Sequence, residues 1–288
     1  MRLLNILKED NIIRVSPEDH LSHVLAKLST SHDAAFVFDD KDKFLGVISP
    51  YYSAIKSSHP GNTKVINCIT RPPKVYLNFP ISKVCELFIQ SKIHYLPVFS
   101  TDDRFQGIVS VRRVLSHFKN MPIFKTKLGD IARKYNRTLV TIKSDDSIND
   151  AFHLFKEKKF SKLVVVDFAG KLKGILTYYD IINFIIGPKN KKGKANKIGN
   201  KSSFYNLHVK TFARSYVITM NKDKELVDVI DVIIKKKIGS VIVIDKNRVP
   251  IDIVTSSDIL RYYITKEKSG FFKQVSSKID RLLLKKET

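Results

Sequence analysis

The chain has 288 residues, of which 43% are hydrophobic and 27% are charged. These proportions are those of a globular protein and exclude a disordered chain, and no apolar run reaches the roughly 20 residues that a membrane helix needs. The 51 basic and 28 acidic residues give a formal net charge of +23, which favours anionic partners. Two cysteines without metal-ligand spacing, Cys68 and Cys85, predict a reduced cytoplasmic protein.

Four segments of the chain, residues 34–49, 95–110, 162–177 and 240–255, repeat one pattern. In each copy an apolar strand ends, a landmark residue follows seven positions later, and a hydroxyl side chain comes three positions after that. Two spacings held constant four times indicate an internal repeat. The landmarks are Gly46, Gly107, Gly174 and Asp252, and the hydroxyl residues are Ser49, Ser110, Thr177 and Thr255.

The elements around each hairpin are also shared. A short strand comes first, at 12–15, 75–77, 139–142 and 217–220, and an amphipathic helix follows. A second helix follows each hairpin. The sequence thus predicts an α/β (α+β) fold of four strand-helix-strand-strand-helix repeats. Capping residues predict that the first helices begin near Ser16, Asn78, Ser144 and Asn221.

A single repeat of about 55–60 residues buries little apolar surface by itself, so we expect the repeats to pack in pairs. The predicted modules are residues 8–120 and 127–266. Residues 187–206 contain six lysines and no acid, which predicts a flexible basic linker. Residues 267–288 place apolar side chains at helical spacing, which predicts an amphipathic helix that packs on this chain or on a dimer partner.

The residues from Gly174 to Asp180 and from Asp252 to Asp258 carry a hydroxyl residue and, three positions later, an aspartate at the start of the second helix. This motif in paired repeats resembles the cystathionine β-synthase (CBS) domain family. The resemblance implies four CBS repeats forming two Bateman modules. It also implies clefts for AMP, ADP, ATP or S-adenosylmethionine, and regulation of a fused or separate effector.

A ribose presents two adjacent hydroxyl donors, and a carboxylate can accept both. The resemblance therefore assigns the ribose to Asp180 and Asp258. Hydroxyl and basic side chains near a helix N-terminus favour phosphate. The predicted ligand-binding residues are Thr177, Asp180, Thr255, Asp258, Ser256, Ser257 and Arg261.

The same Thr-x-x-Asp spacing is also a helix-capping box, a purely structural device. All four copies keep the hydroxyl, whereas the first two have Tyr52 and Arg113 in place of the acid. The acid is therefore dispensable to the fold, which favours ligand binding by the second module. We expect the first module to serve packing, dimerisation or partner contact.

Neither a nucleophile elbow, a phosphate-binding glycine loop nor a metal-binding motif occurs in the sequence, so we expect no enzyme and no metal site. The main hypothesis is a cytoplasmic adenine-nucleotide sensor, a homodimer that regulates an effector protein in trans. One alternative is a nucleic-acid-binding protein that uses its basic surface, with the linker lysines as its strongest feature. Another is a CBS scaffold without a ligand.

Overall fold

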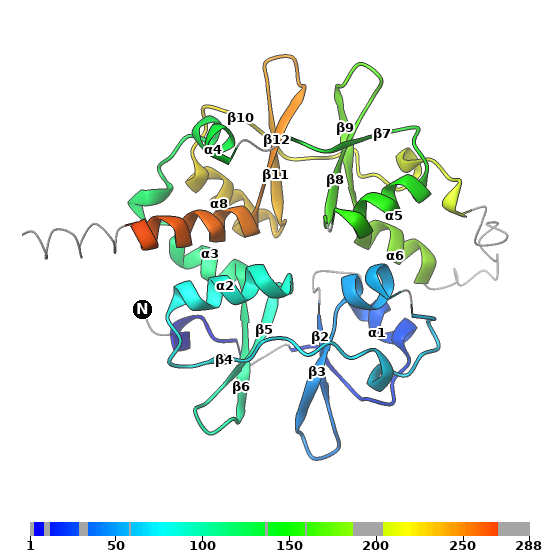
Figure 1. Cartoon of the computed structure of the whole chain (residues 1–288), viewed down its shortest axis with the longest axis vertical. Helices are drawn as coiled ribbons and strands as arrows, with labels where there is room; N and C mark the ends of the chain where they lie inside the picture. Colours follow the sequence, from blue (N-terminus) through cyan, green and yellow to red (C-terminus); the bar gives the residue numbers. More distant parts are fainter. Residues whose placement is uncertain are drawn as a thin grey trace, which may run out of the picture.

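The computed structural model describes residues 3–8, 12–28, 34–57, 59–135, 138–158, 160–186 and 204–269. Most of the predicted basic linker and of the predicted C-terminal helix lies outside these residues. Within them the chain forms four three-stranded sheets, one for each predicted repeat (Figure 1). The predicted α/β fold of four repeats is therefore confirmed.

The elements follow the predicted order. The first repeat contains η1 (Leu3–Ile6), β1 (Arg14–Val15), α1 (Leu21–Leu28), β2 (Ala35–Phe38), β3 (Phe44–Ile48) and the π-helix η2 (Tyr51–Lys56). The second contains η3 (Val65–Cys68), β4 (Val75–Tyr76), α2 (Ile81–Ser91), β5 (Tyr95–Phe99), β6 (Phe105–Ser110) and α3 (Val111–Phe118). The short helix η4 (Pro122–Phe124) and α4 (Leu128–Tyr135) lead into the second half.

The second half repeats this order. The third repeat contains β7 (Thr141–Lys143), α5 (Ile148–Glu157), β8 (Lys162–Val166), β9 (Leu172–Thr177) and α6 (Tyr178–Ile186). The fourth contains η5 (Val209–Thr211), β10 (Thr219–Asn221), α8 (Leu226–Lys236), β11 (Ser240–Ile244), β12 (Pro250–Thr255) and a helix over residues 256–269.

The four sheets share one register. In each, the first strand pairs parallel with the second, and the second pairs antiparallel with the third. The landmark residue always lies opposite the same position of the second strand, one residue before a shift in register. The pairs are Val37 with Gly46, Val98 with Gly107, Val165 with Gly174, and Val243 with Asp252.

The glycine at the landmark position has a steric reason. In three repeats the next residue exchanges two backbone hydrogen bonds with the segment that enters the partner repeat. Ile175 and Arg214 do so at 2.9 and 3.0 Å. A Cβ atom at Gly174 would lie 2.6 Å from the carbonyl oxygen of Arg214. The other two exchanges join Val47 to Thr70 and Ile108 to Lys8.

Asp252 replaces this glycine in the fourth repeat, and the segment equivalent to Arg214 lies partly outside the described residues. Asp252 is buried, and its Oδ1 atom accepts a hydrogen bond of 2.8 Å from the backbone N–H of Ile253. The backbone of its own strand thus supplies one hydrogen bond to the Asp252 side chain, and the register of the sheet is unchanged.

The predicted starts of the first helices are wrong by three to five residues, since the helices begin at Leu21, Ile81, Ile148 and Leu226. The reason is tertiary. Where three of these helices begin, the backbone N–H of the first helical residue donates to a distant segment, as from Ile148 to the carbonyl of Leu207 at 2.8 Å. Side chains such as Ser16 and Asp146 cap turns in the intervening residues instead.

The helices of the two halves meet in the middle of the molecule, and the hairpins point outward (Figure 1). Helix α3 packs on α8, and α1 packs on α6. The ring of Phe118 stacks on that of Tyr263 with centroids 4.3 Å apart, and Tyr51 lies 6.0 Å from Tyr178 on the other side. Apolar contact between the halves thus orders the space that lies between them.

Because the Arg214 backbone lies so close to the third sheet, we expect a methyl group added at Gly174 to destabilise the protein. We expect Gly174→Ala to lower the free energy of unfolding by about 1–3 kcal/mol, as overpacking does, in a urea titration. Gly129→Ala is the control, because its Cβ would meet only atoms of Lys222, the nearest at 3.4 Å, which is ordinary contact, and alanine favours the α4 helix. Equal stability losses in the two variants would contradict the steric explanation.

Candidate functional site

The two motif aspartates cap helices in the same way. In the third repeat, Asp180 Oδ2 accepts hydrogen bonds from the backbone N–H of Thr177 at 2.9 Å and from its hydroxyl at 2.6 Å. Asp258 Oδ2 accepts the same two bonds from Thr255 at 2.8 and 2.7 Å. Each threonine Oγ1 in turn accepts from the aspartate N–H at 3.3 Å. The structural part of the motif is therefore present in both repeats.

Asp180 has a second partner that the motif does not contain. Its Oδ1 atom accepts a hydrogen bond of 2.6 Å from Nε of Arg214, and the two side chains form an ion pair. The Asp180 side chain is 7% exposed and that of Arg214 is 63% exposed. The guanidinium therefore covers the carboxylate on its solvent side.

A cleft of about 810 Å³ lies beside this ion pair. The third and fourth repeats form much of its wall. The first half of the chain forms the rest, mainly through residues of the second repeat such as His94 and Arg112. Five basic residues and no acidic residue line it within the described part of the chain, so it favours an anion. The basic residues are Arg112, Lys162, Arg214, Lys236 and Lys237.

Only some of the predicted ligand-binding residues line this cleft. Thr177 and Ser256, from the third and fourth repeats, line it together. Asp180 reaches it only through Arg214, its partner on the cleft wall. The remaining four predicted residues are not among the lining residues: Thr255, Asp258, Ser257 and the exposed Arg261.

Sequence reasoning missed all five basic residues of the cleft. Arg214 belongs to the segment before β10, and Lys236 and Lys237 end α8, where cations are common. Arg112 comes from the other half of the chain and donates a hydrogen bond of 3.3 Å to the carbonyl of Lys237. No local motif signals these positions, because the tertiary structure alone brings them together.

The first half uses the equivalent positions for structure. Tyr52, at the acid position of the first repeat, donates a hydrogen bond of 2.7 Å to the carbonyl of Ser91. Arg113, at that position in the second repeat, donates at 2.7 Å to the carbonyl of Leu7. Both side chains therefore hold backbone segments of their own half.

The sheets of the first half also differ in what lies between them. Phe38 and Phe44 of one sheet contact Phe99 and Phe105 of the other, and the rings of Phe44 and Phe105 stack 5.8 Å apart. These aromatic rings fill the region between the two sheets. The equivalent residues of the second half are aliphatic or proline: Val166, Leu172, Ile244 and Pro250.

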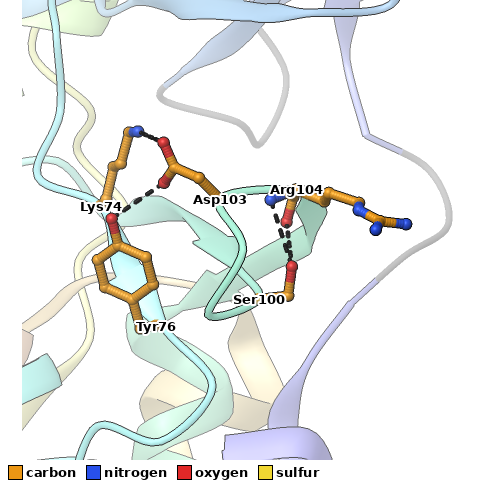
Figure 2. A network of polar contacts seen from close by, with 5 residues as sticks. All are labelled: Lys74, Tyr76, Ser100, Asp103 and Arg104. Atoms are coloured by element: carbon orange, nitrogen blue, oxygen red, sulfur yellow. Dashed lines mark hydrogen bonds and ion pairs between the residues drawn. The ribbon is translucent and has the colours of Figure 1, made fainter.

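Polar contacts close the outer end of this aromatic cluster. Figure 2 shows Lys74 and Tyr76 directed at the Asp103 carboxylate, while the Arg104 side chain points away. Tyr76 donates to Asp103 at 3.0 Å, and Lys74 also lies over the Phe99 ring. The hydrogen bonds from Lys74 and Tyr76 hold the pKa of Asp103 below its usual value, so this acid stays ionised.

The described residues contain no group of three or more potential metal ligands. Cys68 and Cys85 are both free and buried. Burial raises the pKa of the Cys85 thiol well above its usual value, which leaves the thiol protonated and unreactive near neutral pH. In the described part of the chain, no helix has both the length and the apolar character required to cross a membrane.

Repeated sheets, shared register and the hydroxyl–acid motif define a class of proteins built from paired CBS domains. The CBS domain family model matches residues 7–51, 65–120, 128–187 and 209–265, which is more than half of the chain. The chain therefore belongs to the CBS domain family, and it carries four copies of the domain, paired into two Bateman modules.

Known proteins support this assignment. MJ1404 of Methanocaldococcus jannaschii is 27% identical over 191 residues, which cover 66% of this chain and 44% of that protein. A 33.4 kDa protein of Thermofilum pendens is 26% identical over 66% of this chain and 60% of its own length. The chain thus matches about half the length of these relatives. The crystal structure of MJ1225 from M. jannaschii has the same fold, with a TM-score of 0.75 and 18% identity over 91% of this chain and 100% of that one.

The capping geometry predicts a measurable contribution of the motif hydroxyl. We expect Thr255→Ala to lower the free energy of unfolding by about 1 kcal/mol, since the helix over residues 256–269 loses its N-cap. Chemical denaturation would measure this loss. Ser257→Ala is the control, because the Ser257 side chain makes no hydrogen bond within the described residues. Equal stability of the two variants would show that the hydroxyl does not act as a cap.

Proposed function

We propose that the protein is a non-catalytic regulatory protein that binds an adenosine ligand in its second Bateman module and acts on a separate effector protein. The observation that carries the proposal is the cleft beside Thr177 and Ser256, lined by five basic residues and by no acidic residue in the described chain. A site of this kind suits a compact anion such as a nucleotide phosphate.

The cleft offers a partner for each part of a nucleotide. Ser256 and the lysines that end α8 supply donors for a phosphate. Asp180, which lies behind Arg214 and does not itself line the cleft, supplies the acceptor for the ribose hydroxyls. Apolar residues such as Ile175 and Val217, together with the exposed ring of Tyr216, supply a surface for the base. AMP, ADP and ATP therefore fit the lining.

The proposed regulation depends on the fact that residues of both modules line the cleft. His94 and Arg112 of the first module line the same cleft as residues of the second. A ligand that contacts both modules stabilises one arrangement of them relative to others, and a partner protein can read that arrangement. Asp258 provides a second proposed ribose site in the fourth repeat. The first module, with Tyr52 and Arg113 in place of the acid, contributes contacts rather than a ribose site.

The proposal predicts that Asp180 contributes to binding beyond its role as a cap. We expect Asp180→Ala to weaken AMP or ATP binding at least about tenfold, because charge-assisted hydrogen bonds to the ribose are lost. Titration calorimetry would measure the affinity. If Asp258 holds a second ribose, Asp258→Ala removes a separate binding event, and the double variant binds no adenosine ligand.

A matched control separates capping from binding. Asp150 caps α5 with the same three hydrogen bonds to Ser147, at 3.0, 2.6 and 3.2 Å, but it does not line the cleft. Asp150→Ala should lose stability as Asp180→Ala does and keep its ligand affinity. Unchanged affinity in the Asp180 and Asp258 variants, or an equal loss in the Asp150 variant, would contradict the proposed site.

A further inference from the structure

We propose that Arg214 makes the cleft selective for phosphorylated adenosine ligands over neutral nucleosides and over cationic S-adenosylmethionine. This inference rests on the proposed function and concerns the same cleft. It starts from the ion pair between Arg214 and Asp180, which joins the segment between the last two repeats to the motif acid of the third.

The backbone of Arg214 is fixed, and its side chain is not. Two hydrogen bonds to Ile175 hold the backbone against β9. The side chain, 63% exposed, lines the cleft and ends on Asp180, which is 7% exposed. The guanidinium can therefore leave the carboxylate by side-chain rotation alone, without any break in the sheet.

The acceptor sites of Asp180 explain why a ligand must move this side chain. Its Oδ2 atom already accepts two hydrogen bonds from Thr177, which is its normal capacity. The remaining oxygen, Oδ1, accepts from Arg214 at 2.6 Å. A ribose hydroxyl pair that binds Asp180 must therefore take the place of the guanidinium at Oδ1.

The displaced guanidinium then needs a new anionic partner. Within the described residues, no acidic residue lines the cleft, whereas four further basic residues do. A phosphate of the ligand is thus the partner that the site lacks, and an Arg–phosphate contact is a strong one. Adenosine brings no anion. S-adenosylmethionine carries one carboxylate, but its ammonium and sulfonium groups leave it with a net positive charge among the basic residues of the cleft.

In three repeats the described residues include the segment that hydrogen-bonds to the strand after the landmark glycine, and these three can be compared. In each, one residue of the incoming segment exchanges two backbone hydrogen bonds with the strand, and it can be compared with the residue at the acid position of the same repeat. The pairs are Thr70 with Tyr52, Lys8 with Arg113, and Arg214 with Asp180. Of these three pairs, the last alone combines a base with an acid. Among the three repeats in which this contact is described, the third therefore differs from the first two.

Titration calorimetry on the full chain with AMP, adenosine and S-adenosylmethionine tests the inference. We expect the native protein to bind AMP at least about tenfold more tightly than adenosine, the value of one charge-assisted contact. Arg214→Ala should weaken the binding of AMP and leave the binding of adenosine unchanged or tighter. The ratio of the two affinities should therefore fall about tenfold. Arg214→Lys should restore part of the preference, because it keeps the charge.

The control is Arg104→Ala. Arg104 also forms an ion pair through Nε, with Asp102 at 2.6 Å, but it lies on a hairpin of the first module (Figure 2). Its removal should change no affinity. Equal weakening of AMP and adenosine by Arg214→Ala, or an unchanged preference, would overturn the role of Arg214 and leave the proposed function standing. If none of the three ligands binds the native protein or the Arg214 variant, both proposals fail.

Discussion

The structure depends on one backbone contact, the exchange of two hydrogen bonds between the third strand of a repeat and the segment entering its partner. Three such exchanges are described, and all follow a glycine whose Cβ would clash with the incoming segment. Because N–H and carbonyl groups of both segments are satisfied there, the contact fixes where each connecting segment runs. In the second half it also places Arg214 beside Asp180 and builds one wall of the cleft.

The same frame supports different interiors in its two halves. Phenylalanines at four equivalent strand positions fill the space between the first two sheets, and smaller residues occupy these positions in the second half. Tyr52 and Arg113 bind backbone carbonyls where the second half keeps an acid. Ring packing of this kind is worth more than area alone, so the four phenylalanines stabilise the first half at positions where the second half has smaller apolar residues.

Capping and ligand binding are compatible because a carboxylate has more acceptor sites than a cap uses. One oxygen of Asp180 serves the helix, and the other faces Arg214. Asp150 caps α5 with the same geometry and has no part in the cleft. The surroundings of a capping acid, rather than its motif, therefore decide whether it can also serve a ligand.

By itself the sequence determined the four repeats, their strand and helix order, the position of each landmark residue, the family and the loss of the acid in the first two copies. These properties are local and recur along the chain, so spacing alone reveals them. The helix starts were misplaced because backbone pairing with distant segments delays them. Arg214, Arg112 and the lysines that end α8 meet only in the folded chain. Contacts between segments far apart in sequence leave no periodic signal, and they alone decided the shape and charge of the cleft.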